Sequence, residues 1–225
     1  MTVLFEPEIP GLLLKNKSYL KSPDDHSISY NSNTWKKVFQ DDSDFQSIIR
    51  DFPEHLCRSD VANFAKLAFE KGQSIRKVFL ATMIWGYGTV GYGAYRTSKM
   101  LGEKYSYDLI KSSFNFVMEG NYIAAYETLS LPWCGSAFVS KFLYFIGLGC
   151  NVSPLPLILD SVVSNSLEKL GLDISLFAKV NRTNSYINSL QKWSLGYQRY
   201  IELLNNWALN LKCRPDAIEK WLFSM

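Results

Sequence analysis

Two charged side chains stand out because they lie in an otherwise uncharged part of the sequence. Forty residues separate Glu127 from Glu168, and Lys141 and Asp160 are the only formally charged residues among them. Lys141 belongs to residues 137–145, AFVSKFLYF, which would be apolar on nearly every side of a helix. Burial in such a helix favours the neutral amine, which is a nucleophile. A carboxylate nearby can stabilise a positive charge that develops during a reaction.

Both residues also have an ordinary structural interpretation. Asp160 follows the apolar run 155–159 and precedes a predicted helix, where an acid commonly caps the first turn. The aliphatic part of Lys141 can lie along apolar surface while its ammonium reaches water at the edge. The residues alone leave the chemical and the structural interpretation open.

A second candidate region, residues 85–93, reads WGYGTVGYG and formally contains the G-x-G-x-x-G pattern of dinucleotide sites. We reject that interpretation because the pattern follows a capped helix and not a buried strand, and because no β-α-β unit surrounds it. The pattern instead predicts a glycine-rich bend.

This bend brings aromatic and basic residues together. We expect it to direct Trp85, Tyr87 and Tyr92 outwards, with Arg96 and Lys99 just beyond it. Arg96 and Lys99 would then hold phosphate groups. The alternative is a simple kink between packed helices.

A short turn, LPWCG at residues 131–135, separates two predicted helices, and Gly135 opens the second. Backbone N–H groups at such a helix start bind anions such as phosphate. Hydrolase triads and metal sites are not indicated, because the chain has two histidines, no G-x-S-x-G elbow and four cysteines without a C-x-x-C pair. We therefore predict no metal, no cofactor and a reducing cytoplasm.

Basic charge is concentrated in two blocks. The net charge is only +3, but residues 72–117 carry six bases against two acids, and residues 179–214 carry six bases against one acid with tyrosine and tryptophan between them. Residues 41–60 are acidic in compensation. Two basic, aromatic blocks indicate a polyanionic partner, although lysines and arginines that merely solvate helices would give the same pattern.

The elements that must position these residues are mainly helical. Residues 1–33 predict an irregular arm, with short strands near 11–14, and residues 34–225 an all-α domain. Neither residues 1–7 nor the interrupted apolar stretch 142–159 reads as a signal peptide or membrane anchor. The expected helices are 44–51, 60–71 capped by Ser59, 75–85 capped by Ser74, 95–101, 106–119, 122–130, 136–146, 160–170, 173–180, 183–191, 197–211 and 216–223.

The combination of turn, lysine and aspartate resembles the helix–hairpin–helix DNA glycosylase superfamily, in its 8-oxoguanine glycosylase branch. The similarity is best over residues 75–160, in FLATMIWGYGTVGYGAYRTSKML, LPWCGSAFVSKFLYF and PLILD, and is weaker in RPDAIEKWLF at 214–223. The resemblance implies a two-lobed helical fold with its hairpin at 131–135. It also implies that Lys141 attacks the sugar C1′ and that Asp160 stabilises the developing charge and assists proton transfer.

The chain departs from this family at two points. The family hairpin is commonly L-P-G-V-G, and its first glycine is Trp133 here. The usual lysine position is Ala137, so Lys141 lies one helical turn later on the same face. The archaeal 8-oxoguanine glycosylases look similar in placing a lysine deep in an aromatic-rich helix. The iron–sulfur cysteines of many relatives are missing, which favours the cluster-free branch.

These observations predict a monomeric cytoplasmic DNA glycosylase, associated with the nucleoid when it binds DNA. Its partner would be double-stranded DNA with a modified base, either 8-oxoguanine or a hypermodified base of invading phage DNA. A wedge and an aromatic cradle are needed to extrude a base, and the candidates are Trp85, Tyr87, Trp133 and Trp207. The alternatives are a non-catalytic helical DNA-binding module and a helical protein that binds another partner.

Overall fold

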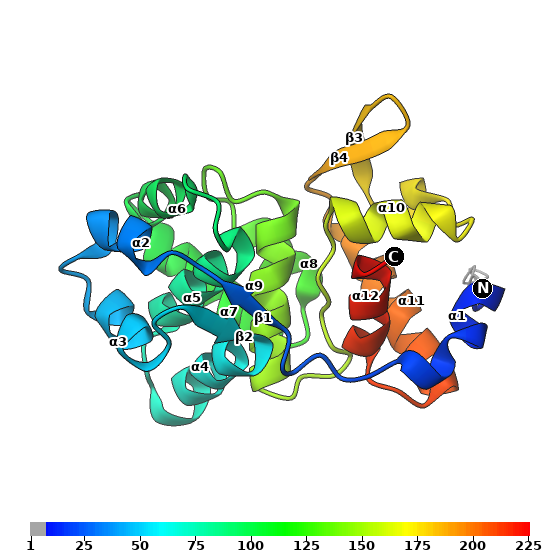
Figure 1. The fold of residues 1–225 in the computed structure, drawn as a ribbon, viewed down its shortest axis with the longest axis horizontal. Helices are drawn as coiled ribbons and strands as arrows, with labels where there is room; N and C mark the ends of the chain where they lie inside the picture. The colour runs from blue at the N-terminus through cyan, green and yellow to red at the C-terminus, as the bar shows by residue number, and fades with distance from the viewer. Residues whose placement is uncertain (1–7) are drawn as a thin grey trace.

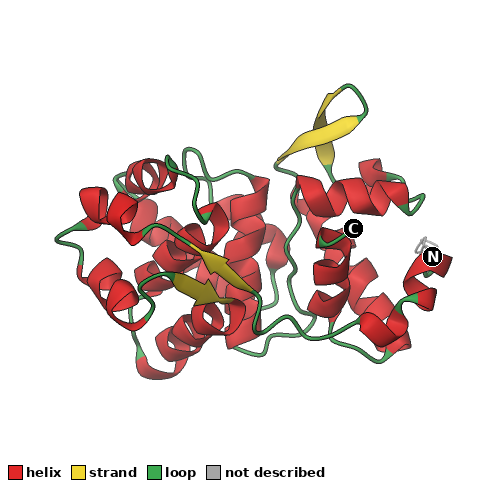
Figure 2. Ribbon diagram, in the orientation of Figure 1, coloured by secondary structure: helices red, strands yellow, loops and turns green. Residues whose placement is uncertain are grey.

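The computed structural model describes residues 8–225, so residues 1–7 of the predicted arm lie outside it. The described chain is mostly helical, as expected, with twelve α-helices, two 3-10 turns and two small sheets (Figure 2). The helices are α1 (Gly11–Lys15), α2 (Ser32–Phe39), α3 (Ser43–Asp51), α4 (Arg58–Lys71), α5 (Ile75–Tyr87), α6 (Gly93–Leu101), α7 (Ser106–Met118), α8 (Tyr122–Thr128), α9 (Ser136–Gly149), α10 (Ser161–Lys169), α11 (Ser194–Leu211) and α12 (Pro215–Phe223).

The helices gather in two groups that the chain connects twice. Figure 1 shows α2 to α9 on one side of the molecule and α10, α11 and α12 with α1 on the other. An N-terminal segment crosses between the groups ahead of α2, and residues 150–160 cross back between α9 and α10. Buried apolar side chains from both groups form one cluster.

Helix α5 shows how the sequence sets the contacts of the central helices. It begins where Ser74 accepts a hydrogen bond from the backbone N–H of Lys77, as its sequence predicts. The helix continues through Gly86, where a Cβ atom would lie only 2.8 Å from Cε1 of Phe138 on α9. Because Gly86 has no side chain, α5 and α9 approach closely there. The helix ends at Gly88, whose φ of 54° suits glycine.

The N-terminal arm is more regular than expected. Residues Gly11–Lys15 form α1, so the prediction of strands near 11–14 is wrong; the strand of the arm is β1 (Ser27–Ser29), which pairs antiparallel with β2 (His55–Cys57). This pairing covers the start of α4. That helix begins at Arg58, and Asp60 accepts from the N–H of Cys57, so Ser59 is not its cap.

A β-hairpin replaces two predicted helices. Strands β3 (Lys179–Thr183) and β4 (Tyr186–Gln191) pair antiparallel and project from the body of the molecule (Figure 1), after the short 3-10 turn Ile174–Leu176. Ile187 is fully buried, and its backbone N–H and C=O both bond to the side chain of Asn165 on α10. These two hydrogen bonds to a residue distant in the sequence hold β4 in an extended conformation that the local sequence pattern did not indicate.

Candidate active site

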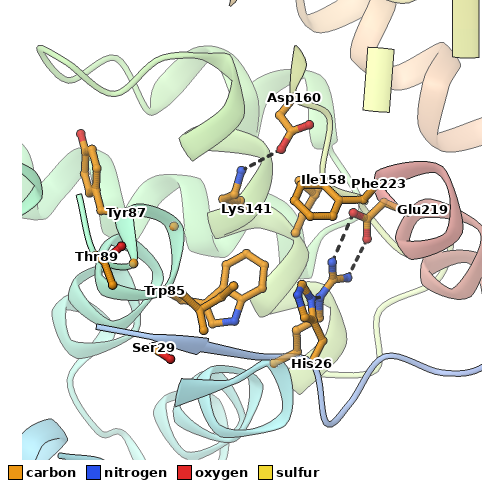
Figure 3. Close-up of a pocket in the computed structure, with 14 residues that line it drawn as sticks. His26, Ser29, Trp85, Tyr87, Thr89, Lys141, Ile158, Asp160, Glu219 and Phe223 are labelled. Atoms are coloured by element: carbon orange, nitrogen blue, oxygen red, sulfur yellow. Dashed lines mark hydrogen bonds and ion pairs between the residues drawn. The ribbon is translucent and has the colours of Figure 1, made fainter. Parts of the chain in front are cut away.

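A pocket of about 420 Å³ lies where the two groups of helices meet (Figure 3). Its walls come from the N-terminal arm, from α4, α5 and α9, from the segment before α10, and from α12. Among the side chains that line it are His26, Arg58, Trp85, Lys141, Asp160, Glu219 and Phe223.

The structure brings Lys141 and Asp160 together in this pocket. The Nζ atom of Lys141 lies 3.3 Å from Oδ2 of Asp160 (Figure 3), and the two residues are only 8% and 9% exposed. Lys141 lies on the buried helix α9, and Asp160 lies at the end of the segment that crosses to α10. The two residues form one ion pair at the wall of the pocket. The amine and the carboxylate face the same cavity.

Asp160 also has the capping role that the sequence predicts. Its Oδ1 accepts hydrogen bonds of 3.1 Å from the N–H groups of Val162 and Val163 at the start of α10, while Oδ2 faces Lys141. The structural and chemical interpretations are therefore compatible, because each uses a different oxygen of the same carboxylate.

Hydrogen bonds made by the residues next to Lys141 and Asp160 hold these two side chains in position. The hydroxyl of Ser140 accepts from the N–H of Leu159 at 3.1 Å, which joins the residues adjacent to Lys141 and Asp160. On α11, the hydroxyls of Tyr197 and Tyr200 donate to the carbonyls of residues 157 and 158. Both tyrosines are fully buried, so they position this segment and do not form part of an exposed basic surface.

A second ion pair, which sequence reasoning missed, lines the same pocket. Arg58 donates from Nη1 to Oε2 of Glu219 at 2.6 Å and from Nη2 to Oε1 at 3.3 Å, and both side chains are almost completely buried. The guanidinium lies 5.3 Å from the ring of Trp85 and 5.1 Å from that of Tyr144. Burial raises the pKa of Glu219, and Arg58 opposes that effect.

His26 is a further hydrogen-bond partner of Arg58. Its Nδ1 accepts from Nε of Arg58 at 3.2 Å, which requires the neutral imidazole. Burial, together with Arg58 and Lys220, lowers the pKa of His26 to about 4, against a small opposite effect of Asp25. No local signal marks this cluster, because its members come from the arm, from α4 and from α12.

The aromatic residues of the glycine-rich bend differ from expectation. Trp85 and Tyr87 are 5% and 6% exposed, so the prediction that both point outwards is wrong, while Tyr92 is 52% exposed. Trp85 and Tyr87 nevertheless line the pocket, although in Figure 3 the hydroxyl of Tyr87 points away from Lys141. Burial raises the pKa of Tyr87 to about 12, and the neighbouring Arg96 works in the opposite direction.

The remaining predicted residues fall into different surroundings. Arg96 packs against aromatic rings instead of standing free, and Lys99 lies 5.4 Å from the ring of Tyr95. Gly135 is exposed at the start of α9, with its neighbour Trp133 also exposed. Trp207 is 2% exposed within the core and does not line the pocket, so it does not belong to the site.

Residues 8–225 contain no group of three or more histidine, cysteine, aspartate or glutamate residues placed to hold a metal ion. Within the same range, every helix is too short or too polar to cross a lipid bilayer.

Comparison with known families identifies the chain. The family described as "Putative 8-oxoguanine DNA glycosylase OGG-like protein" matches residues 21–223, so the chain belongs to this family of DNA glycosylase-like proteins. No curated protein and no solved structure gave a significant match. The family match spans residues 21–33 of the arm, helices α2 to α12 and every residue of the pocket.

Proposed function

We propose that this protein is a DNA glycosylase that extrudes a modified base from DNA into the pocket and cleaves its N-glycosidic bond. The observation that carries the proposal is the buried contact between Lys141 and Asp160 at the pocket wall, in a chain of the OGG-like family. The two groups of helices would act as the lobes of a glycosylase fold, with α8, the hairpin at residues 131–135 and α9 as its helix–hairpin–helix motif.

Asp160 would lower the barrier to bond cleavage. Glycosidic cleavage leaves positive charge on the sugar C1′ and its ring oxygen, and a fixed carboxylate beside them stabilises that charge. Its Oδ1 is already held by two backbone N–H groups, so little reorganisation is needed during the reaction. Oδ2 remains for the substrate and for Lys141.

Lys141 would act as the nucleophile. Its Nζ gives a proton to Oδ2 of Asp160, and the neutral amine then attacks C1′. As the Nζ–C1′ bond forms, the bond from C1′ to the base breaks, its electron pair stays on the base nitrogen, and Asp160 returns the proton to the base. Opening of the C1′–O4′ bond, with transfer of the Nζ proton to O4′, gives an imine that permits strand cleavage by β-elimination.

The rest of the pocket suits a flipped base. Trp85 and Phe223 offer apolar ring surface, whereas Lys141 and Asp160 supply polar groups. A mostly apolar cavity with a few fixed polar groups is the usual form of a small-molecule site. Of the predicted cradle residues, Trp85 is therefore retained, Trp207 is not, and Tyr87 is too buried to serve as a wedge.

The DNA would be held near the start of α9. The exposed Gly135 presents the first N–H groups of this helix, and a phosphate is the natural partner of such a helix terminus. Lys99, which is exposed on α6, would add a cation for the flanking backbone. We expect a monomer that acts without a metal or cofactor in the cytoplasm and associates with the nucleoid through DNA.

Two substrate classes follow from this proposal. One is 8-oxoguanine, the base in the family description, and a role in genome repair. The other is a hypermodified base, for which a volume of about 420 Å³ leaves room beyond a purine, with a role in defence against phage DNA.

The direct test is base release from a panel of DNA duplexes and of the corresponding single strands. Each duplex would carry one modified base, including 8-oxoguanine, 5-hydroxymethylcytosine and its glucosylated form, and free base would be detected by mass spectrometry. The double variant Lys141→Gln, Asp160→Asn is the control for contaminating enzymes. Release of no base by the wild-type protein, with DNA binding retained, would favour a non-catalytic DNA-binding module in which the ion pair is structural.

A further inference from the structure

An exposed cluster of aromatic and basic residues lies beside the pocket and has no part in the chemistry above. The guanidinium of Arg96 lies 4.1 Å from the ring centre of Tyr92 and 5.1 Å from that of Trp133. Tyr92 belongs to the glycine-rich bend and Trp133 to the turn before α9, so one cation joins two separate loops. We call Tyr92, Tyr95, Arg96, Lys99 and Trp133 the aromatic platform.

The rings of the platform are open to solvent. Tyr92, Tyr95 and Trp133 are 52%, 56% and 57% exposed. Tyr95, Arg96 and Lys99 follow Tyr92 by three, four and seven residues. This spacing places the four side chains on one face of α6. The opposite face, with Ala94, Thr97 and Met100, is buried; the platform is therefore the outer surface of an anchored helix.

Trp133 occupies a backbone conformation that favours glycine. Its φ is 63°, in the left-handed region that residues with a Cβ atom adopt only at a cost in free energy. Its side chain is exposed, so burial of the indole in the core does not repay that cost. A large ring at a strained, solvent-exposed position indicates that the ring itself serves a purpose.

The platform begins at the pocket. The rings of Tyr92 and Tyr87 are 5.9 Å apart, edge to face, and Tyr87 lines the pocket. On the other side, Trp133 lies in the turn that leads directly into α9, which carries Lys141. Nucleotides next to one held in the pocket would therefore reach the platform.

We propose that the aromatic platform stacks unpaired bases, so that the preferred substrate is single-stranded DNA with the target base in the pocket. Exposed rings interleaved with cations suit a single strand, because its bases have free faces while its phosphates need positive charge. A duplex hides those faces within its own stack. The inference rests on the proposed function only for the identity of the target nucleotide.

The test compares binding of two unmodified DNAs, so it does not depend on base release. Fluorescence anisotropy would measure the Kd for a labelled single strand of mixed sequence and for the duplex of the same sequence and length. We expect the single strand to bind more tightly. Trp133→Gly should weaken single-strand binding about tenfold while leaving duplex binding within about twofold, as expected for the loss of one base–aromatic stack.

The same variant separates binding from folding. Because glycine relieves the strain at φ 63°, Trp133→Gly should not lower the Tm of the protein. Tyr19→Ala is the matched control, since Tyr19 is 72% exposed in the N-terminal arm, outside both basic blocks, and its loss should leave both Kd values unchanged.

Tighter binding of the duplex, or an equal loss of duplex and single-strand binding in Trp133→Gly, would overturn the inference and identify Trp133 as a duplex contact. Unchanged single-strand binding in that variant would overturn it as well. These outcomes differ from failure of the proposed function, which would appear as absence of base release from every modified DNA.

Discussion

Two buried ion pairs line the same pocket, and they differ in how completely their charges are satisfied. Arg58 and Glu219 meet through two hydrogen bonds, and Arg58 also bonds to His26 and lies against two aromatic rings. Lys141 and Asp160 share one contact of 3.3 Å. The first pair has its polar groups occupied, whereas the second retains donor and acceptor capacity for a substrate.

This difference separates structural from chemical roles for the same kinds of side chain. A planar guanidinium with bidentate geometry is difficult to disengage, because any movement leaves two charges buried without partners. A lysine with a single, longer contact can release its partner and bond to another atom. We therefore propose that the arginine pair holds α4 against α12 and that the lysine pair takes part in the reaction.

The largest effect should come from the nucleophile. Lys141→Gln should abolish trapping of the protein on its DNA substrate by borohydride, because only a primary amine forms a reducible imine. The measurement is the covalent complex on a denaturing gel. Trapping that persists in this variant would rule out Lys141 as the nucleophile, and base release without trapping would mean that Asp160 directs attack by water.

The arginine pair should instead show its effect in stability. Glu219→Ala leaves Arg58 buried without its partner and should lower the free energy of unfolding by about 3–5 kcal/mol, measured by urea denaturation. The control is Glu168→Ala, which removes the exposed partner of Arg182 and should change stability little. Equal effects of the two substitutions would refute a locking role for the buried pair.

Asp160 allows its two roles to be measured apart. Asp160→Asn should slow base release at least about a hundredfold, an electrostatic loss of about 2.7 kcal/mol, while the protein still folds. Folding should survive because asparagine caps helices about as well as aspartate. Base release near the wild-type rate would leave Asp160 with the cap alone.

The smallest effect concerns pH. An unfolded histidine binds a proton near pH 6.5, whereas folded His26 does so only near pH 4, so the unfolded state binds more protons between these values. The contribution of His26 to the free energy of unfolding is therefore present above pH 6.5 and is lost as the pH falls towards 4. Allowing for partial exposure of the ring, we expect a loss of about 1–2 kcal/mol across this range.

His26→Asn should flatten this pH dependence, because the side-chain oxygen of asparagine can still accept from Arg58 but does not titrate. Urea denaturation at pH 4.5 and 7 would compare the two proteins. The same fall in stability in both would show that another group near Arg58 titrates in this range.

The sequence allowed prediction of the lysine pair because its two members are the only charges in a long apolar stretch. Their separation of 19 residues is bridged by one helix and one loop, so a local interpretation sufficed. Arg58 and Glu219 are 161 residues apart, and only the complete fold shows that they meet. The two helix caps at Ser74 and Asp160 were predictable for the same reason, because a cap bonds to backbone N–H groups in the turn that directly follows it.

The errors also have identifiable causes. Trp85 and Tyr87 are buried because Gly86 lets α9 approach, and the sequence of α5 does not show which helix will pack there. Residues 173–191 were predicted as helices, but the bonds from Asn165 to Ile187 hold β4 extended. In both places a contact distant in sequence overrides the local preference.

The wide spacing of the arginine pair has a consequence for synthesis of the protein. Ribosomes add about 5–20 residues per second, so the 161 residues between Arg58 and Glu219 take about 8–32 s to make. During that interval the guanidinium has no carboxylate partner and must stay hydrated. The wall that α4 contributes to the pocket therefore cannot close until α12 has been translated, which makes completion of this site one of the last events in folding.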